Sequence, residues 1–435
     1  MIGYGYEFIS PANFDLPLAK VKNGILAPDG PAYKVLVLRS NDLLTLAGTE
    51  KLVQFAKQGL PIIIQGGIPT TIASANGLQK AQENIKSILS LKNVRQVGAG
   101  PLAPALAAMG IEPRTKVSMA NCLTYWRHDS DTETDYGLVF NDGANTSTGS
   151  VTFDTQKTPF FLNAWTGIEE PVVEYVISAS KQVTIPFTLA PGQNALVVFR
   201  DSKYNESPKN QVTSAPANLG YVYSKENGIS IKVPAASTPG RLTLSNSKTV
   251  QIPAQKVRPA ITLGNWKLIA ESWKPGPDLY DSATIGTKTN KTFILPVLAS
   301  WPDISGLKNT SGVGYYSTNF TWNKSDGSGA IIDFGPIQNT IRVRVNGKQI
   351  PPLDFSAAKA DISAYLKEGV NVIEPTVATT LYNGLVPILP LLKSSGDGLR
   401  FGYGIAVIPG LTPPSVPAGL LGTVTVTPFN LVPVA

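Results

Sequence analysis

The sequence predicts a multidomain, mainly β protein, in which a small α/β domain precedes a β-sandwich and a jelly roll. Among its 435 residues, 39 Gly and 35 Pro separate short apolar runs, as turns do between many strands. Apolar strands alternate with helical spacing before residue 115, and runs with period two follow it. A hydrophobic content of 43%, with 15% charged residues, is enough to bury a core.

Residues 1–115 have the β-α-β order of a parallel sheet. Residues 34–38 and 61–67 are apolar throughout, as in strands buried on both faces, and residues 41–58 between them have helical spacing. We predict further helices at 77–91 and 101–109 and a third strand at 94–97. Together these elements predict a flavodoxin-like α/β domain.

Residues 116–258 predict a β-sandwich domain with a polar connecting segment. Alternating runs of strand length are separated by turn clusters such as Asn141-Asp142-Gly143. The polar, Pro- and Ser-rich part at 203–255 predicts one or two extra hairpins with loops. The expected sandwich strands lie at 136–141, 149–153, 172–177, 183–189 and 195–199.

Residues 259–435 predict the jelly-roll domain. Apolar and charged residues alternate over 341–345, which indicates a half-buried strand, and Asn346-Gly347 behind it indicates a tight hairpin turn. A short ordered segment is expected from Asp361 to Gly369.

Composition argues against several kinds of partner and site. The net charge of +7 is small for this length and no basic run is interleaved with aromatics, so we expect no nucleic-acid partner. No stretch approaches the roughly 18 apolar residues of a membrane helix, so no membrane partner is expected either. Cys122 is the single cysteine, which excludes an intrachain disulfide and a thiolate metal cluster.

The expected compartment is extracellular, as for a secreted glycoprotein. Six Asn-X-Ser/Thr sequons favour it, although chance alone gives about four or five in such a chain. Residues 1–4 show no charged segment leading into an apolar one, so no secretory peptide is visible. Either the protein is intracellular or this is not its natural start. The sequon asparagines are Asn145, Asn205, Asn290, Asn309, Asn319 and Asn323.

Six blocks of the sequence stand in an order typical of one family. They are 4–10, 21–38, 127–141 with Arg127-His128, 163–192 with Asn163-Ala164-Trp165-Thr166-Gly167, Gly264-Asn265-Trp266, and Val345-Asn346-Gly347. This order resembles the region after the catalytic barrel in the large α-L-rhamnosidase-type glycoside hydrolases of family 106. The resemblance implies an α/β domain, a β-sandwich and a galactose-binding-like jelly roll, a fold that usually assists catalysis.

The resemblance implies no catalytic residue in this chain. The family's catalytic glutamates lie in a TIM-type barrel on the N-terminal side of this region, and we expect no such barrel among these 435 residues. Family members also carry a Tyr-Asn-Arg segment near the end of the jelly roll. This sequence has Tyr382-Asn383-Gly384 instead, which removes a guanidinium group that could clamp a partner.

The densest titratable cluster is His128, Asp129, Asp131, Glu133 and Asp135. In an extended segment the four carboxylates would share one face, and Asp131 with Glu133 could supply the acid and base of glycoside hydrolysis. The alternative, which we favour, is a solvated loop, because nothing apolar nearby would raise a carboxyl pKa. A serine triad through His128 is disfavoured because no Gly-x-Ser-x-Gly elbow is present.

Other candidate sites are weaker. Gln65-Gly66-Gly67 could cradle a phosphate, but the third glycine and the acidic partner of a dinucleotide site are missing, so a plain turn is favoured. No cofactor and no metal are expected, apart from a structural Ca²⁺ that Asp303 or Asp333 could support.

Aromatic side chains of the last domain could stack on sugar rings. Most of them lie on strand-like runs, where core packing is the favoured interpretation. Trp301 and Tyr382, with Asn383, are the predicted carbohydrate-binding residues. The full aromatic set is Trp266, Trp273, Trp301, Tyr315, Tyr316, Trp322 and Tyr382.

Three hypotheses about function stay open. The first is a non-catalytic or catalytically incomplete rhamnosidase-like protein, a glycan-binding or structural accessory region of a glycoside hydrolase. The second is an active hydrolase or lyase on rhamnose-containing glycans, with its site here or shared with a partner chain. The third is a fragment of a full-length enzyme whose catalytic domain is missing.

Overall fold

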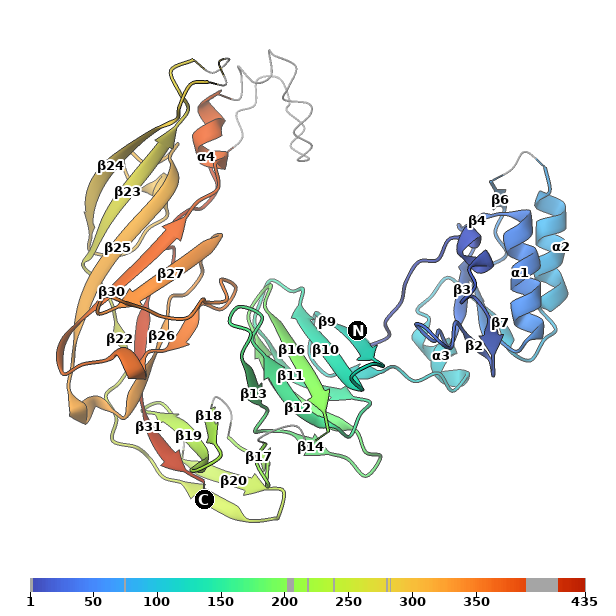
Figure 1. Ribbon diagram of the computed structural model, residues 1–435, viewed down its shortest axis with the longest axis horizontal. Helices are drawn as coiled ribbons and strands as arrows, with labels where there is room; N and C mark the ends of the chain where they lie inside the picture. Colours follow the sequence, from blue (N-terminus) through green and yellow to red (C-terminus); the bar gives the residue numbers. More distant parts are fainter. Residues whose placement is uncertain are drawn as a thin grey trace. The chain divides into compact units, whose positions relative to one another are not determined.

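The structure, a computed structural model, describes residues 3–73, 76–201, 207–216, 219–237, 239–278, 281, 283–388 and 414–434. The chain divides into two compact units, Ile2–Lys116 and Val117–Ala435. The first unit mixes helices with short strands, and the second is built almost wholly of strands (Figure 1). The predicted multidomain, mainly β fold that begins with an α/β part is therefore confirmed.

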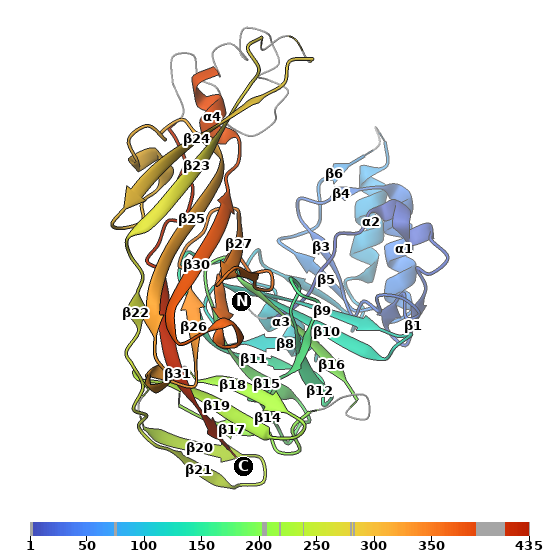
Figure 2. The same cartoon turned by 60° about the vertical axis from the view of Figure 1, so that its left-hand side comes forward.

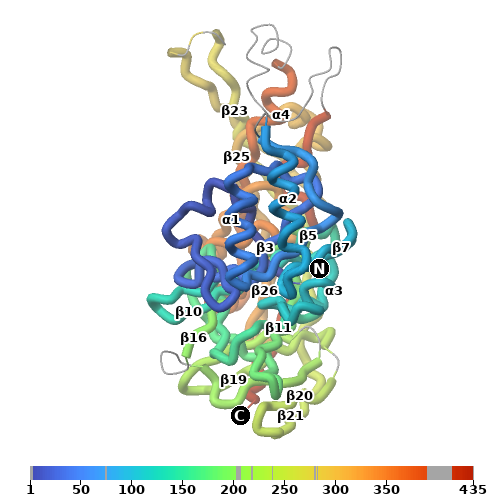
Figure 3. Tube along the Cα trace, turned by 90° about the vertical axis from the view of Figure 1, so that its right-hand side faces the viewer, coloured from blue at the N-terminus to red at the C-terminus, as the bar shows by residue number. Residues whose placement is uncertain are grey.

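A parallel sheet in the order β3-β5-β7 is the centre of the first unit. Ile62, Ile63 and Ile64 of β5 are fully buried because both faces of the sheet are covered. Helices α1 and α2 lie side by side against one face (Figure 3), and α3 packs with Ile63 on the other. The elements are β3 (Leu36–Arg39), α1 (Leu46–Lys57), β5 (Ile62–Gln65), α2 (Leu78–Ile88), β7 (Val94–Val97) and α3 (Ala103–Ala108), preceded by η1 (Pro11–Asp15), β1 (Val21–Lys22) and β2 (Ile25–Leu26).

Helix α1 begins later than the predicted start at residue 41. Strand β4 (Leu43–Leu44) precedes it and pairs with β6 (Thr71–Ile72). Thr45 then caps the helix, since its side-chain oxygen accepts a hydrogen bond of 3.0 Å from the Gly48 N–H. The cap, rather than the first apolar residue, sets where the helix starts.

The second unit opens with a sandwich of two sheets, in the orders β13-β12-β16-β10-β9 and β14-β15-β11-β8. Val139, Phe153 and Phe199 are fully buried in the core between them. The strands are β8 (Thr115–Val117), β9 (Cys122–Asp129), β10 (Thr134–Asn141), β11 (Ser147–Phe153), β12 (Thr158–Leu162), β13 (Glu169–Pro171), β14 (Val176–Ile177), β15 (Val183–Leu189) and β16 (Asn194–Arg200).

Residues 172–177, predicted as one strand, form a strand only in β14. Their backbone pairs elsewhere, because the Val212 N–H donates to the Val173 carbonyl and the Tyr175 N–H to the Val212 carbonyl. The hairpins predicted in the polar segment are present, as β18 pairs with β19 and β20 with β21. The strands here are β17 (Val212–Ser214), β18 (Gly220–Ser224), β19 (Gly228–Pro234), β20 (Gly240–Leu244) and β21 (Thr249–Ile252).

The jelly roll packs the sheet β24-β23-β25-β30-β27-β28 against the sheet β18-β19-β31-β26-β29. Trp266, Trp301 and Phe334 are fully buried in its core. Asn346 and Gly347 have φ angles of 51° and 78° and form the predicted turn between β27 and β28. The elements are β22 (Ile261–Thr262), β23 (Trp266–Lys274), β24 (Thr287–Leu295), η3 (Trp301–Asp303), β25 (Ser311–Trp322), η4 (Lys324–Asp326), β26 (Gly329–Asp333), β27 (Thr340–Val345), β28 (Lys348–Gln349), β29 (Lys359–Asp361), η5 (Ser363–Tyr365), β30 (Gly369–Ala378), α4 (Tyr382–Leu385), η6 (Val386–Ile388) and β31 (Thr425–Pro433).

Strand β31 joins the segments before and after residue 258. It pairs with β19 on one side and with β26 on the other (Figure 2). Val426 of β31 lies in the jelly-roll core, and Val434 just beyond the strand packs with Ile231 of β19. The domain division predicted at residue 258 therefore runs through one continuous sheet.

Candidate functional site

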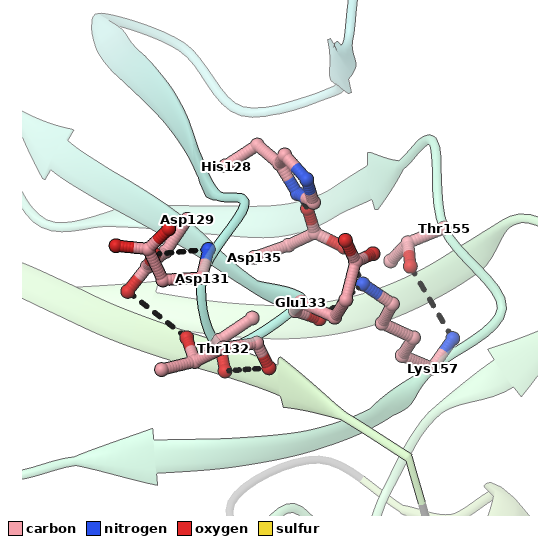
Figure 4. A network of polar contacts seen from close by, with 9 residues as sticks. His128, Asp129, Asp131, Thr132, Glu133, Asp135, Thr155 and Lys157 are labelled. Carbon is pink, nitrogen blue, oxygen red and sulfur yellow. Dashed lines mark hydrogen bonds and ion pairs between the residues drawn. The ribbon is translucent and has the colours of Figure 1, made fainter.

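The titratable cluster predicted between His128 and Asp135 lies at the turn between β9 and β10 (Figure 4). Strand β9 ends at Asp129 and β10 begins at Thr134, so that Asp135 pairs with His128 across the hairpin. The chain reverses direction between the four carboxylates. The extended arrangement, which would have placed them on one face, is therefore not formed, in agreement with the favoured loop.

Asp131 and Glu133, the candidates for a catalytic pair that the sequence disfavoured, are both exposed in this turn. The Glu133 backbone carbonyl, not its carboxylate, accepts a hydrogen bond of 2.5 Å from Lys157 Nζ. Both carboxyls face solvent, whereas the acid of a glycosidase needs an apolar surrounding. The geometry fits the solvated loop that the sequence favoured.

Asp129 holds the turn together. One carboxylate oxygen accepts a hydrogen bond of 2.9 Å from the Thr132 hydroxyl, and the other accepts one of 3.0 Å from the Asp131 N–H. These two bonds, that from Thr132 first, lower the pKa of Asp129. The carboxylate therefore stays ionised and stabilises the hairpin rather than exchanging a proton with a substrate.

Asp135 is the buried member of the cluster, with a side chain 10% exposed. Its Oδ1 lies 2.7 Å from His128 Nδ1, and its Oδ2 lies 2.9 Å from Lys157 Nζ. The ammonium group balances the charge of the buried carboxylate. Within the described residues no serine hydroxyl contacts His128, so this trio lacks a nucleophile and is best explained as a structural ion pair.

The glycines after β5 form a turn rather than an open cradle. The Gly66 N–H donates to the Val97 carbonyl at 2.9 Å, and the Gln65 side-chain amide donates to the Gly100 carbonyl at 2.7 Å. These two N–H donors are therefore engaged within the protein and do not point at a ligand, as expected for a plain turn.

The predicted calcium ligands stand apart from other ligating side chains. Asp303 is exposed, and Asp333 pairs with Lys359 at 3.1 Å. The part of the chain that the structure describes holds no group of three or more His, Cys, Asp or Glu that could bind a metal. Across the same residues, no helix is both long and apolar enough to cross a membrane. The sequon asparagines at 145, 290, 309, 319 and 323 are exposed, and Asn205 lies outside the described residues.

The prediction that Trp301 is an exposed sugar platform is wrong, because its side chain is fully buried. Its Nε1–H donates to the Tyr316 hydroxyl at 2.8 Å. Asn383 is buried as well, and its amide both donates to the Val416 carbonyl and accepts from the Val416 N–H, each at 2.9 Å. These residues hold segments of the fold in place rather than contacting solvent.

The other aromatic residues divide between core and surface. Trp266, Tyr316 and Trp322 are buried in the jelly-roll core, which confirms core packing for them. Trp273 and Tyr315 are 40% and 42% exposed on the outward face of their sheet. Lys288 Nζ lies 4.3 Å from the centre of the Trp273 ring and covers one face of it.

Tyr382 lines a hollow of about 270 Å³ at one end of the jelly roll, which we call the Tyr382 hollow. Three segments form it: the loop before β27, the end of β30 with α4, and residues 416–418. Its lining contains no charged side chain. The lining residues are Gln338, Asn339, Thr379, Thr380, Tyr382, Asn383, Val416, Pro417 and Ala418.

The polar groups of the Tyr382 hollow were missed at the sequence level. The side-chain amides of Gln338 and Asn339 have no hydrogen-bond partner among the described residues, so they are available to a ligand. A signal existed, since polar residues precede the predicted strand at 341–345. The missing information was that Thr340 pairs with Ala378, which brings these residues beside Tyr382.

Comparisons with known proteins show the fold. No protein-family model matches the sequence, and no curated protein matches it either. Among solved structures, a rhamnosidase from Novosphingobium sp. PP1Y is 20% identical with a TM-score of 0.58, and the match covers 98% of this chain and 36% of the rhamnosidase. The chain is thus similar in fold to a part of that rhamnosidase and spans about a third of its length.

Two further enzymes of known structure match with TM-scores that are too low to show a shared fold. A β-D-glucuronidase from Dictyoglomus thermophilum is 16% identical with a TM-score of 0.24, over 40% of this chain and 29% of the enzyme. An α-L-rhamnosidase from Dictyoglumus thermophilum is 10% identical with a TM-score of 0.17, over 60% of this chain and 25% of the enzyme.

Proposed function

We propose that the chain is a non-catalytic or catalytically incomplete region of an α-L-rhamnosidase-like protein, which binds carbohydrate as an accessory to a catalytic domain. That domain lies on the same polypeptide or on a partner chain. The likeness in fold to part of the Novosphingobium rhamnosidase supports the proposal. So does the order of sequence blocks that resembles the post-barrel region of family 106 enzymes.

The lining of the Tyr382 hollow is the observation that carries this proposal. Sugar hydroxyls both donate and accept hydrogen bonds, as the amides of Gln338 and Asn339 and the hydroxyl of Thr380 do. The ring of Tyr382 offers a flat surface to the apolar C–H face of a sugar. Because no charged group lines the hollow, the favoured ligand is a neutral saccharide.

The binding test uses the whole chain and neutral, rhamnose-containing oligosaccharides in isothermal titration calorimetry. We expect Tyr382→Ala and Asn339→Ala each to weaken binding about tenfold, which corresponds to about 1.4 kcal/mol. The matched control is Tyr315→Ala, which removes an exposed tyrosine outside the hollow and should bind as the unmodified chain does. Equal affinities of Tyr382→Ala and the unmodified chain would remove this site.

The same preparations should release no product from aryl rhamnosides or rhamnose-containing polysaccharides. The exposed positions of Asp131 and Glu133 are the physical reason. Turnover that is lost in Asp131→Asn or Glu133→Gln would contradict the accessory role and support a hydrolase site at the β9–β10 turn.

A further inference from the structure

A second hollow, of about 420 Å³, lies on the outward face of the five-stranded sheet of the sandwich. We call it the Arg127 hollow. Its side chains come from the neighbouring strands β9, β10 and β16, where they alternate with residues buried in the sandwich core. They are Tyr125, Arg127, Asp129, Tyr136, Leu138 and Leu196.

The register places Arg127 beside two tyrosines. Tyr136 lies directly opposite Arg127 on β10, and Tyr125 precedes Arg127 by two residues on the same face of β9. Side chains directly opposite each other have Cβ atoms about 5 Å apart. Tyr125 is 51% exposed, so its ring is accessible from solvent. The hollow therefore combines two flat apolar surfaces with one cation.

The guanidinium of Arg127 is available to a ligand. It has no hydrogen-bond or ion-pair partner among the residues that the structure describes. Asp129 is the one acid of the hollow, and its two oxygens accept bonds from Asp131 and Thr132 of the adjacent turn. Those bonds are the larger causes of its lowered pKa and the nearby charge of Arg127 is a smaller one, but no hydrogen bond or ion pair joins the two side chains. Unpaired N–H donors and a permanent positive charge therefore face the hollow.

We propose that the Arg127 hollow binds an acidic saccharide, with a pyranose ring against Tyr125 and Tyr136 and its carboxylate or sulfate on Arg127. A planar guanidinium can form two parallel hydrogen bonds to such an anion. Leu138 and Leu196 supply the apolar part of the floor. The Tyr382 hollow has no charged lining, so the two sites differ in ligand class and neither depends on the other.

The test titrates the whole chain with trigalacturonate, with a sulfated chondroitin disaccharide and with neutral maltotriose. We expect at least one acidic ligand to bind at least tenfold more tightly than maltotriose. Arg127→Met, which keeps the length of the side chain, should weaken that binding at least tenfold, and Arg127→Lys should weaken it less. Arg241→Met removes an exposed arginine elsewhere in the same unit and is the matched control.

Two results would overturn the proposal: an Arg127→Met chain that binds acidic ligands as the unmodified chain does, or equal binding of acidic and neutral ligands. Circular dichroism and a melting curve check that Arg127→Met is folded, and Arg127→Lys provides a second variant. Binding of only the carboxylated or only the sulfated ligand supports the proposal and identifies the anion. Tyr382→Ala should bind the acidic ligands as the unmodified chain does, so the proposals for the two hollows are tested independently.

Discussion

Trp301 shows how a single buried side chain shapes a surface that it does not reach. Its backbone N–H donates to the Ala418 carbonyl at 2.9 Å, and the Tyr316 hydroxyl that it contacts accepts from the Leu420 N–H at 3.1 Å. Gly419 lies between these contacts with φ of 89°, and a Cβ there would lie 2.5 Å from the Trp301 ring. Glycine at this position therefore lets the chain form one wall of the Tyr382 hollow.

Replacing Gly419 with alanine should destabilise the jelly roll and weaken neutral saccharide binding. The positive φ alone costs about 1–3 kcal/mol, and the clash with Trp301 adds to this. Gly369→Ala is the control, because Gly369 has φ of 85° but a methyl group added there would meet no other atom within 4 Å. Thermal denaturation and calorimetry measure both effects. Equal losses of stability in the two variants would contradict a role for the close approach of residue 419 to the Trp301 ring.

At the scale of elements, Asp361 connects strands that are far apart in the sequence. It ends β29, accepts a hydrogen bond of 2.9 Å from the Ser363 N–H at the start of η5, and pairs at 2.7 Å with Lys232 of β19. Burial by itself would raise the pKa of Asp361. The bonds from Lys232 and Ser363 outweigh burial, so the pKa is lowered.

Asp361 should make the stability of the second unit depend on pH in the acidic range. Because its pKa is lower in the folded chain than the ordinary value of about 3.9, its contribution is complete above that value. The contribution is lost as the pH falls through the folded pKa. Urea denaturation between about pH 5 and pH 2 should show a smaller loss for Asp361→Asn than for the unmodified chain. Asp303→Asn, at an exposed aspartate, is the control; parallel curves for all three chains would refute the prediction.

Local patterns predicted the elements better than the sites. The β-α-β order and the turn at Asn346-Gly347 follow from apolar period and from residues that tolerate positive φ, both of which are visible over a few residues. The reversal after Asp129 lacks an Asn-Gly type signal, so the sequence indicated a loop there but not a hairpin turn that pairs His128 with Asp135. Trp301 lies in the short helix η3, where no alternation of apolar and polar residues indicates which side chains are buried. The Arg127 hollow depends on the register of three strands, which a single sequence does not reveal.

At the scale of the whole molecule, each buried core belongs to one unit. The two clusters around the β3-β5-β7 sheet draw all their members from the first unit, and the three clusters of the β parts draw theirs from the second. Since each unit has its own apolar core, each has its own source of stability.

Differential scanning calorimetry should therefore resolve two thermal transitions. Ile63→Ala removes a fully buried side chain from the first unit and should lower one transition only, by about 2–5 kcal/mol in stability. Val426→Ala, in the core of the second unit, should lower only the other. Leu431→Ala, at a residue 43% exposed on the same strand as Val426, is the control. A variant that shifts both transitions together would show that the units unfold as one.

The position of β31 in the chain has a consequence for biosynthesis. A ribosome completes β31 after every other described strand, yet β19 and β26 both need it as their neighbour. Until it emerges, each nascent strand keeps an unpaired edge that can attach to other chains. Production of this protein in a heterologous host thus depends on shielding those edges until translation has passed β31.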